Sequence, residues 1–156
     1  MFLIREHYRQ VAITTDIIVG FPGETAQEFA ETREFVREIN FYETHIFKYS
    51  PRKGTKAATM PEQVAENLKS ERSKAMLELG AANKRDFMES VIGQECEVLV
   101  EEKTDINGEI YFVGHTREYF KFAFKDGGNK VGKIVSVVAK DILDGEYILG
   151  EMPCIL

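Results

Sequence analysis

Two short loops carry the backbone and side chains best suited to holding a ligand. The first reads Gly20-Phe21-Pro22-Gly23-Glu24 and follows a run of β-branched residues at 11–20. The second covers residues 49–56, follows another short apolar run and presents the positive charges of Arg52 and Lys53. Ligands of parallel α/β sheets bind at the carboxyl ends of strands, where such loops lead into helices. Two loops of this kind at adjacent strand ends predict a shared ligand-binding rim.

An acidic side chain, Asp16, interrupts the apolar run at residues 11–20. A carboxylate in the middle of a buried strand is costly unless it is paired or hydrogen-bonded. The sequence leaves two interpretations open: a structural anchor with a backbone or basic partner, or a group that faces a polar ligand cavity.

A third group of residues alternates along positions 117–125, which we expect to form one strand. The phenylalanines on one face are expected to be core: Phe120, Phe122 and Phe124. The opposite face carries Arg117, Tyr119, Lys121 and Lys125. Basic side chains beside an aromatic ring can neutralise phosphates and stack a nucleobase, so this face is a candidate RNA-binding surface. An ordinary solvated face is the alternative.

The composition excludes several classes of protein. The chain has 156 residues, of which 44% are hydrophobic, and no apolar run reaches the roughly 18–20 residues that span a membrane. The two cysteines, Cys96 and Cys154, have no second Cys or His at ligand spacing, which excludes a zinc ribbon, a disulfide scaffold and a self-contained iron–sulfur site. We interpret both as small core or surface residues, and His45 as a packed residue. The pattern predicts a cytoplasmic globular protein without a membrane partner.

Charge and pattern both change near residue 90. Residues 1–85 carry 13 Lys and Arg against 12 Asp and Glu, whereas residues 86–156 carry 7 against 14. We therefore predict two domains, at 1–90 and 91–156. The net negative charge of the second is the main internal argument against RNA binding.

The first domain is expected to be α/β. A strand at 11–20 is followed by a helix whose capping box pairs Thr25 with Glu28 and which ends near Asn40. A strand at 43–50 and a helix from Pro61 to about residue 90 complete the pattern, which indicates part of a parallel α/β barrel. One face of that helix is expected to be apolar, and Gly80 is expected to kink or break it. The residues of that face are Val64, Leu68, Ala75, Leu79 and Ala82.

The second domain is expected to be a small all-β barrel of about five strands, separated by glycine-containing turns. By contrast, two strands and two helices do not bury both faces of a sheet, so the first domain is incomplete. We expect its uncovered face to favour self-association.

The loop motifs carry a resemblance to a known family. The segments TTDIIVGFPGET and HIFKYSPRKGTKAATMPEQV resemble the radical S-adenosylmethionine methylthiotransferases. The later segments IGQECEVLVEE, VGHTREYFKF and GKIVSVVAKDILDGEYILGE resemble the TRAM domain that ends these enzymes. The resemblance covers nearly the whole chain after its first ten residues and is closest to the branch that acts on threonylcarbamoyl-adenosine in tRNA.

The resemblance implies a function for the whole enzyme. It would transfer a methylthio group to carbon 2 of N6-threonylcarbamoyl-adenosine beside the tRNA anticodon, using S-adenosylmethionine and two 4Fe-4S clusters. The cluster cysteines of the family are absent here, so the chain would correspond to the C-terminal part of such an enzyme and be inactive alone. No catalytic residue and no metal ligand is predicted within it.

The resemblance also implies binding residues. The cofactor pocket would be lined by Asp16, Ile18, Gly20, Phe21, Pro22, Gly23, Glu24, Tyr49, Ser50 and Pro51. The anticodon stem-loop of tRNA would be contacted by Arg52, Arg117, Tyr119, Lys121 and Lys125. Alternatives are a methylthiotransferase for isopentenyl-adenosine in tRNA or for a ribosomal protein, and a non-catalytic RNA-binding adaptor.

Overall fold

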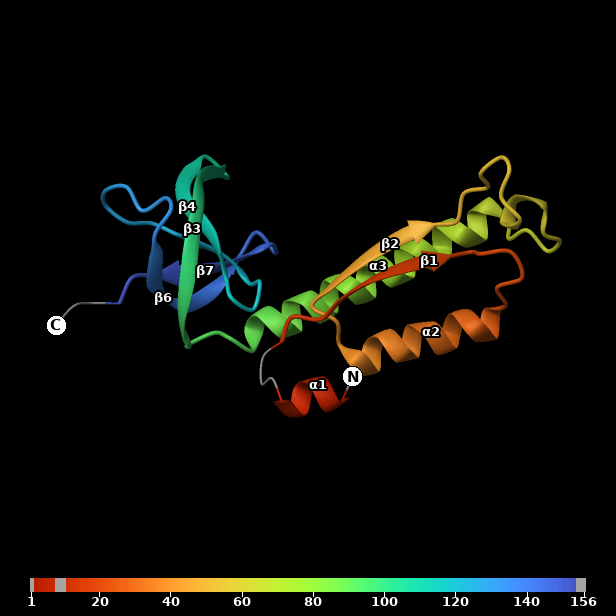
Figure 1. The fold of residues 1–156 in the computed structure, drawn as a ribbon, viewed down its shortest axis with the longest axis horizontal. Coiled ribbons are helices and arrows are strands. Elements are labelled where there is room, and N and C mark those ends of the chain that lie inside the picture. The colour runs from red at the N-terminus through yellow and green to blue at the C-terminus, as the bar shows by residue number, and fades with distance from the viewer. Residues whose placement is uncertain (1, 8–10, 154–156) are drawn as a thin grey trace. The chain divides into compact units, whose positions relative to one another are not determined.

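The computed structural model describes residues 2–7 and 11–153 (Figure 1). It divides into two compact units: residues 13–84 form the first, whereas residues 85–153 and the segment around the short helix α1 (Phe2–His7) group with the second. The division lies inside a long helix, earlier in the chain than the domain boundary expected at residue 90.

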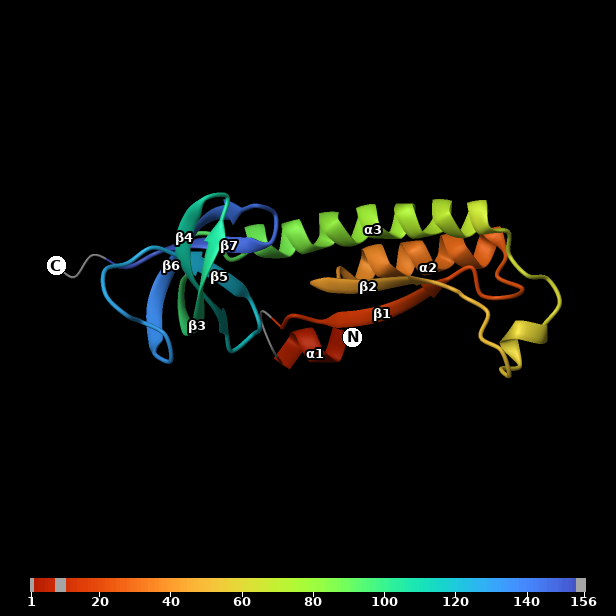
Figure 2. The same cartoon turned by 90° about the horizontal axis from the view of Figure 1, so that it is seen from above.

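The first unit is a two-stranded parallel sheet with two helices. It contains β1 (Thr14–Val19), α2 (Ala26–Ile39), β2 (Glu43–Lys48), the 3-10 turn η1 (Ala57–Thr59) and most of α3 (Glu66–Glu89). The helices α2 and α3 lie on the same side of the sheet in Figure 2. The expected alternation of strand and helix is confirmed, although both strands are shorter than predicted because the flanking residues enter loops.

The core of this unit lies between the helices and one face of the sheet. Val19 of β1, Val36 and Ile39 of α2, and Met76 of α3 are buried together. The capping box at Thr25 forms as predicted, and Asn40 ends α2 in the left-handed conformation. Neither helix of the first unit covers the opposite face of the sheet.

The start of α3 differs from the prediction. The helix begins at Glu66 rather than at Pro61, because Met60 is extended and Glu62 has a φ of 58°. Proline disfavours helical geometry at the residue before it, here Met60, and a residue in the left-handed conformation interrupts a helix. Residues 60–65 therefore belong to the loop that follows η1.

The buried face of α3 is also different from the predicted one. Leu68 and Ala82 are exposed, whereas Lys69, Arg72 and Met76 are buried. Polar side chains occupy this face because it covers the first ligand-loop motif as well as the apolar sheet. The prediction is therefore wrong for Leu68 and Ala82, whereas Leu79 packs against the core of the first unit as expected.

Gly80 neither kinks nor breaks α3. A Cβ atom at this position would lie 2.2 Å from Oγ1 of Thr44 on β2. The glycine therefore permits the close approach of helix and strand.

The second unit contains a closed five-stranded barrel. Its strands are β3 (Glu95–Ile106), β4 (Glu109–Thr116), β5 (Lys121–Phe124), β6 (Ile134–Leu143) and β7 (Tyr147–Glu151). They close in the order β3-β4-β5-β7-β6, and all pairs are antiparallel except β5 with β7 (Figures 1 and 2). The five predicted strands are present. No helix within the described residues is long and apolar enough to cross a membrane.

The barrel core confirms the predicted phenylalanine face, since Phe120, Phe122 and Phe124 are all buried. The single strand predicted at 117–125 is wrong at its beginning. Residues 117–119 form a tight turn in which Tyr119 donates its backbone N–H to the carbonyl of Thr116, and β5 begins only at Lys121. The alternation of faces therefore holds along β5 but not through the turn.

Candidate functional site

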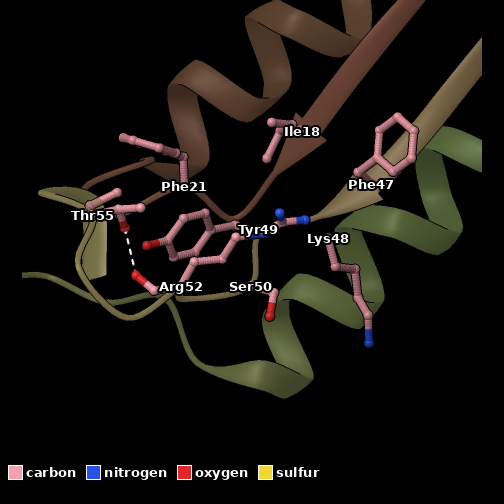
Figure 3. A pocket seen from close by; sticks show the side chains of 9 residues that line it. Ile18, Phe21, Phe47, Lys48, Tyr49, Ser50, Arg52 and Thr55 are labelled. Carbon is pink, nitrogen blue, oxygen red and sulfur yellow. Dashed lines mark hydrogen bonds between the residues drawn. The ribbon is translucent and has the colours of Figure 1, made fainter.

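A hollow of about 400 Å³ opens at the carboxyl ends of β1 and β2, where the two loop motifs meet (Figure 3). Its lining residues are Ile18, Phe21, Phe47, Lys48, Tyr49, Ser50, Arg52, Thr55 and Ala57. The structure thus brings together five residues that the sequence singled out: Ile18, Phe21, Tyr49, Ser50 and Arg52. Phe47, Lys48, Thr55 and Ala57 were missed, because nothing in a local pattern shows which side of the second loop faces the first.

The walls of this hollow are flat and apolar. Ile18 and Phe47 are neighbours across the parallel strands, and both remain more than half exposed. Phe21 packs edge-on against Tyr49, with ring centroids 5.2 Å apart and planes at 68°. Such walls suit a planar aromatic ring.

Polar groups at the same hollow lack partners. The hydroxyl of Tyr49 is buried and has no hydrogen-bond partner within the described residues. Arg52 forms no ion pair with any described side chain. An uncompensated guanidinium is suited to a carboxylate or phosphate.

The turn at residues 20–24 is held rigidly beside the hollow. Gly20 has a φ of 73°, and a Cβ atom there would lie 2.4 Å from Cγ of Lys69, so only glycine fits. Its backbone N–H donates to the carboxylate of Glu24, and the N–H of Glu24 donates to the carbonyl of Phe21 at 2.9 Å. Gly23 donates its backbone N–H to the carbonyl of Glu62 at 3.0 Å, which ties the turn to the loop at residues 60–65.

Glu24 is a structural group in this turn. One nitrogen of Arg72, Nη1, donates to its carboxylate at 2.6 Å and to its carbonyl at 3.0 Å. The side chain of Arg72 is only 4% exposed and lies over the ring of Phe29. We therefore expect Glu24 to shape the pocket through the turn. Arg72 was missed because a basic residue in a charged helix is typical of the solvent side.

The other predicted cofactor residues lie around this hollow rather than in it. Pro22, Gly23 and Glu24 line a second, shallower hollow next to Phe21. Pro51 lines neither of the two. Backbone contact by these residues stays a prediction.

Asp16 lies on the uncovered face of the sheet and is exposed, opposite His45 of β2. It has no side-chain hydrogen bond or ion pair within the described residues and lines neither of the two hollows, so its predicted place in the cofactor pocket stays a prediction. His45 is exposed as well, which corrects the expectation that it is packed.

Two lysines share one carboxylate beside the hollow. Lys48 donates to Glu66 at 2.7 Å, and the buried Lys69 lies 3.6 Å from the same carboxylate. The hydrogen bond from Lys48 lowers the pKa of Glu66. Together with Arg52, this leaves the rim of the hollow positively charged.

The basic face predicted on the barrel is largely neutralised. Lys121 pairs with Glu146 and Lys125 with Glu109, each at 2.8 Å. The hydrogen bond to Glu109 raises the pKa of Lys125. A lysine that already has a carboxylate partner contributes less to phosphate binding, which weakens the predicted role of both.

Arg117 and Tyr119 line a separate hollow of about 350 Å³ on the barrel. The ring of Tyr119 stacks on His115, with centroids 4.9 Å apart and planes at 25°. Nδ1 of His115 lies 2.8 Å from Oε2 of Glu101. His115 could not be singled out from the sequence, because it becomes adjacent to Tyr119 only through the turn at 117–119.

Metal ligands do not gather in the described part of the chain. No group of three or more His, Cys, Asp or Glu side chains that could hold a metal ion occurs there. Cys96 is half-buried on β3, and burial raises the pKa of its thiol. Cys154 lies outside the described residues.

Comparison with known proteins places these sites in context. No protein-family model matches the chain. The threonylcarbamoyladenosine tRNA methylthiotransferase MtaB of Bacillus subtilis is 42% identical over 128 residues, which cover 81% of this chain and 28% of that protein. This chain is a relative of the tRNA methylthiotransferases. The resemblance drawn from the loop motifs is confirmed.

Relatives with another named substrate match as well. The tRNA-2-methylthio-N(6)-dimethylallyladenosine synthase of Pelotomaculum thermopropionicum is 44% identical over 125 residues, covering 80% of this chain and 28% of that enzyme. The enzyme of the same name from Acetivibrio thermocellus is 39% identical over 134 residues, covering 86% and 28%. The chain thus spans less than a third of the length of these relatives, and their names divide between two modified adenosines.

Proposed function

We propose that the chain is the C-terminal part of a radical S-adenosylmethionine methylthiotransferase that modifies an adenosine beside the tRNA anticodon. The observation that carries the proposal is the apolar hollow formed by the two motif loops at the ends of parallel strands. In this proposal the first unit is part of the α/β barrel that holds the cofactor, and the second is a TRAM-like RNA-contacting barrel in a cytoplasmic enzyme.

The hollow fits the adenosyl group of S-adenosylmethionine. Ile18, Phe21 and Phe47 supply apolar walls for a planar base, and the buried, unpartnered hydroxyl of Tyr49 lies beside them. Ser50 provides a polar contact at the rim, and Arg52 at the same rim is proposed to contact a phosphate of the tRNA. When bound, S-adenosylmethionine would supply the radical chemistry, while these residues would orient the adenosine and exclude water.

The two 4Fe-4S clusters do not fit this chain. The sequence has two cysteines, far apart, and a cluster takes several cysteine thiolates. No step of cluster chemistry can therefore be assigned to these residues. The ligands would belong to sequence outside the 156 residues, and the chain alone would be inactive.

For the substrate we favour N6-threonylcarbamoyl-adenosine, in line with MtaB of Bacillus subtilis. The names of other relatives support a dimethylallyl-adenosine (that is, isopentenyl-adenosine) as the second candidate, at similar identity. A gene inactivation in the source cell, followed by mass spectrometry of tRNA nucleosides, separates them. Loss of the methylthio group from threonylcarbamoyl-adenosine supports the proposal, loss from the isopentenylated nucleoside supports the alternative, and loss of neither overturns both.

A binding experiment tests the hollow itself. Phe21→Ala in the protein that carries this chain should weaken the binding of S-adenosylhomocysteine, measured by calorimetry. Phe35→Ala is a matched control because Phe35 is also a half-exposed phenylalanine of the first unit and lies outside the hollow. Equal binding by both variants would contradict the assignment.

A further inference from the structure

The turn at residues 117–119 holds an aromatic side chain in an unfavourable conformation. Tyr119 has a φ of 75°, in the left-handed region that L-residues other than Asn, Asp and Gly rarely adopt. The bonds of Thr116 enforce it: Thr116 donates its N–H to the carbonyl of Phe120, and its Oγ1 accepts from the N–H of Phe120. Yet the side chain of Tyr119 is 65% exposed and contributes little to the core. A strained residue that adds little to packing is often retained for a function.

The ring lies at one end of a row of exposed apolar and aromatic groups across the barrel. Ile134 of β6 pairs with Leu99 of β3, and Leu99 pairs with His115 of β4, which stacks on Tyr119. Ile134 is 68% exposed and Leu99 is 46% exposed. Together these side chains line the hollow of about 350 Å³. Its volume is sufficient for one planar heterocycle.

Charge determines what the hollow would hold. Arg117 lies at the rim with no ion pair among the described residues, whereas Glu101 is occupied by His115. Glu97 also lines the hollow, and its carboxylate has no hydrogen bond or ion pair within the described chain. A carboxylate accepts hydrogen bonds from the amino group of a base, and it repels phosphate.

We propose that the hollow formed by Tyr119, His115, Leu99 and Ile134 stacks one unpaired nucleobase that carries an exocyclic amino group. Tyr119 stacks the base, Glu97 accepts from its amino group, and Arg117 contacts an adjacent phosphate. Glu101 holds the ring of His115 in its stack with Tyr119, at 25° between the planes, and is a positioning residue. This inference rests on the proposed tRNA substrate and keeps Arg117 and Tyr119 of the predicted RNA-binding surface, whereas Lys121 and Lys125 are paired with carboxylates.

A cationic side chain of a peptide is the alternative ligand for this hollow, and a nucleobase is favoured over it. Glu97 and the two rings would also suit an arginine, but Arg117 at the same rim would repel it. The matched relatives are named for tRNA modification, which supplies a nucleic-acid partner.

The experiment measures binding of the full chain to three RNAs: a tRNA transcript, a single-stranded oligoadenylate and the same strand paired with its complement. Tyr119→Ala should lower affinity for the tRNA and the single strand about 10-fold, while the slope of affinity against salt stays unchanged. Arg117→Gln should reduce that slope by about 1, as expected for a phosphate contact. Affinity for the duplex should not respond to Tyr119→Ala.

Two further variants separate binding from folding. Ile110→Ala is the control because Ile110 is 59% exposed on the same barrel and lies outside the hollow. Tyr119→Gly should raise the melting temperature of the barrel, since glycine adopts a φ of 75° without strain, and should still lose RNA affinity. A purely structural tyrosine would not give these opposite signs.

The outcomes distinguish this inference from the proposed function. If Tyr119→Ala binds every RNA as the unmodified chain does, the nucleobase site is wrong while the methylthiotransferase proposal stands. If the gene inactivation leaves tRNA unchanged but affinity for the single strand still depends on Tyr119, the methylthiotransferase proposal is wrong while the nucleobase site stands. Failure of the unmodified chain to bind any of the three RNAs, or displacement of RNA by an oligoarginine that binds through Tyr119, overturns the inference.

Discussion

The two units bury the apolar faces of their sheets in different ways. The barrel pairs all five strands in a closed circuit, so that its core is enclosed by its own strands. The first unit has two strands, covers one face with helices and leaves Ile18 and Phe47 exposed on the other. Its ligand-binding hollow lies at the end of that open face.

The two units also differ in where their energetically unfavourable groups lie. In the barrel the buried residues are almost all apolar, and the strained residue, Tyr119, is at the surface. In the first unit a charged pair, Arg72 with Glu24, is buried to fix a turn beside the hollow. Closure makes the barrel self-sufficient, whereas the first unit depends on polar contacts that define one loop.

The largest expected effect comes from the barrel core. Phe122 is fully buried, and Phe122→Ala should destabilise the barrel by about 3–5 kcal/mol. Hydrogen exchange should then accelerate in residues 95–151 while the core of the first unit keeps its protection. Ile110→Ala should change stability by less than about 0.5 kcal/mol. Loss of protection in both units together would show that they unfold as one.

Breaking the buried pair should be nearly as damaging to the first unit. Arg72→Met leaves the carboxylate of Glu24 without its cation and should cost about 3–5 kcal/mol. The double variant Arg72→Met/Glu24→Gln should recover much of this loss in urea unfolding. Arg85→Met is the control on the same helix, since its pair with Glu89 is exposed and contributes little to stability. A double variant no more stable than the single one would show that the charge pair is not the cause.

One glycine in each unit permits a close contact between neighbouring elements, and substituting both compares the two contacts. A Cβ at Gly114 would lie 2.0 Å from the carbonyl oxygen of Leu99, and one at Gly80 would lie 2.2 Å from Oγ1 of Thr44. Either alanine should destabilise its unit by about 1–3 kcal/mol, with Gly114→Ala the larger because backbone cannot yield. Adding Thr44→Ala should rescue Gly80→Ala, since the obstructing oxygen is removed. Thermal unfolding of the single and double variants checks this, and an unrescued Gly80→Ala would point to a different obstacle.

The smallest effect concerns a surface pair of the barrel. The hydrogen bond from Lys125 lowers the pKa of Glu109, so the stabilisation exists above the ordinary pKa of a glutamate and is lost as pH falls through the folded value. Lys125→Gln should raise the pKa of Glu109 towards its ordinary value and flatten the acid limb of the unfolding curve. Carbon NMR titration of the carboxyl group measures the shift. An unchanged pKa would mean that the pair does not persist in solution and that Lys125 is free for RNA.

Local signals predicted much of the fold. The β-branched run gave β1, the capping box of Thr25 gave the start of α2, and Asn40 gave its end. The predicted start of α3 was wrong. Pro61 is typical of a first helical residue, but Glu62 takes a left-handed conformation that no local pattern shows. The single strand predicted at 117–125 was wrong at its beginning. The alternation of polar and apolar residues continues across a tight turn, which hydrogen bonds of Thr116 create.

The candidate site divides in the same way. The two loop motifs could be predicted because strand ends and glycine-containing turns are local features, and the five lining residues were implied by the resemblance to the methylthiotransferases. Lys69, Arg72 and His115 could not, since each becomes important through a contact between segments far apart in the chain or across a turn.

By itself, the sequence determined the two-part organisation, the relationship to methylthiotransferases and the loops that form the hollow. These follow from periodicity, turn residues and motifs, which short stretches of chain encode. Only the tertiary structure decided that Glu24 is locked by Arg72, that Lys121 and Lys125 are neutralised, and that Tyr119 stacks on His115. The physical reason is that hydrogen bonds, ion pairs and stacking act over a few ångströms in space and are independent of separation along the chain.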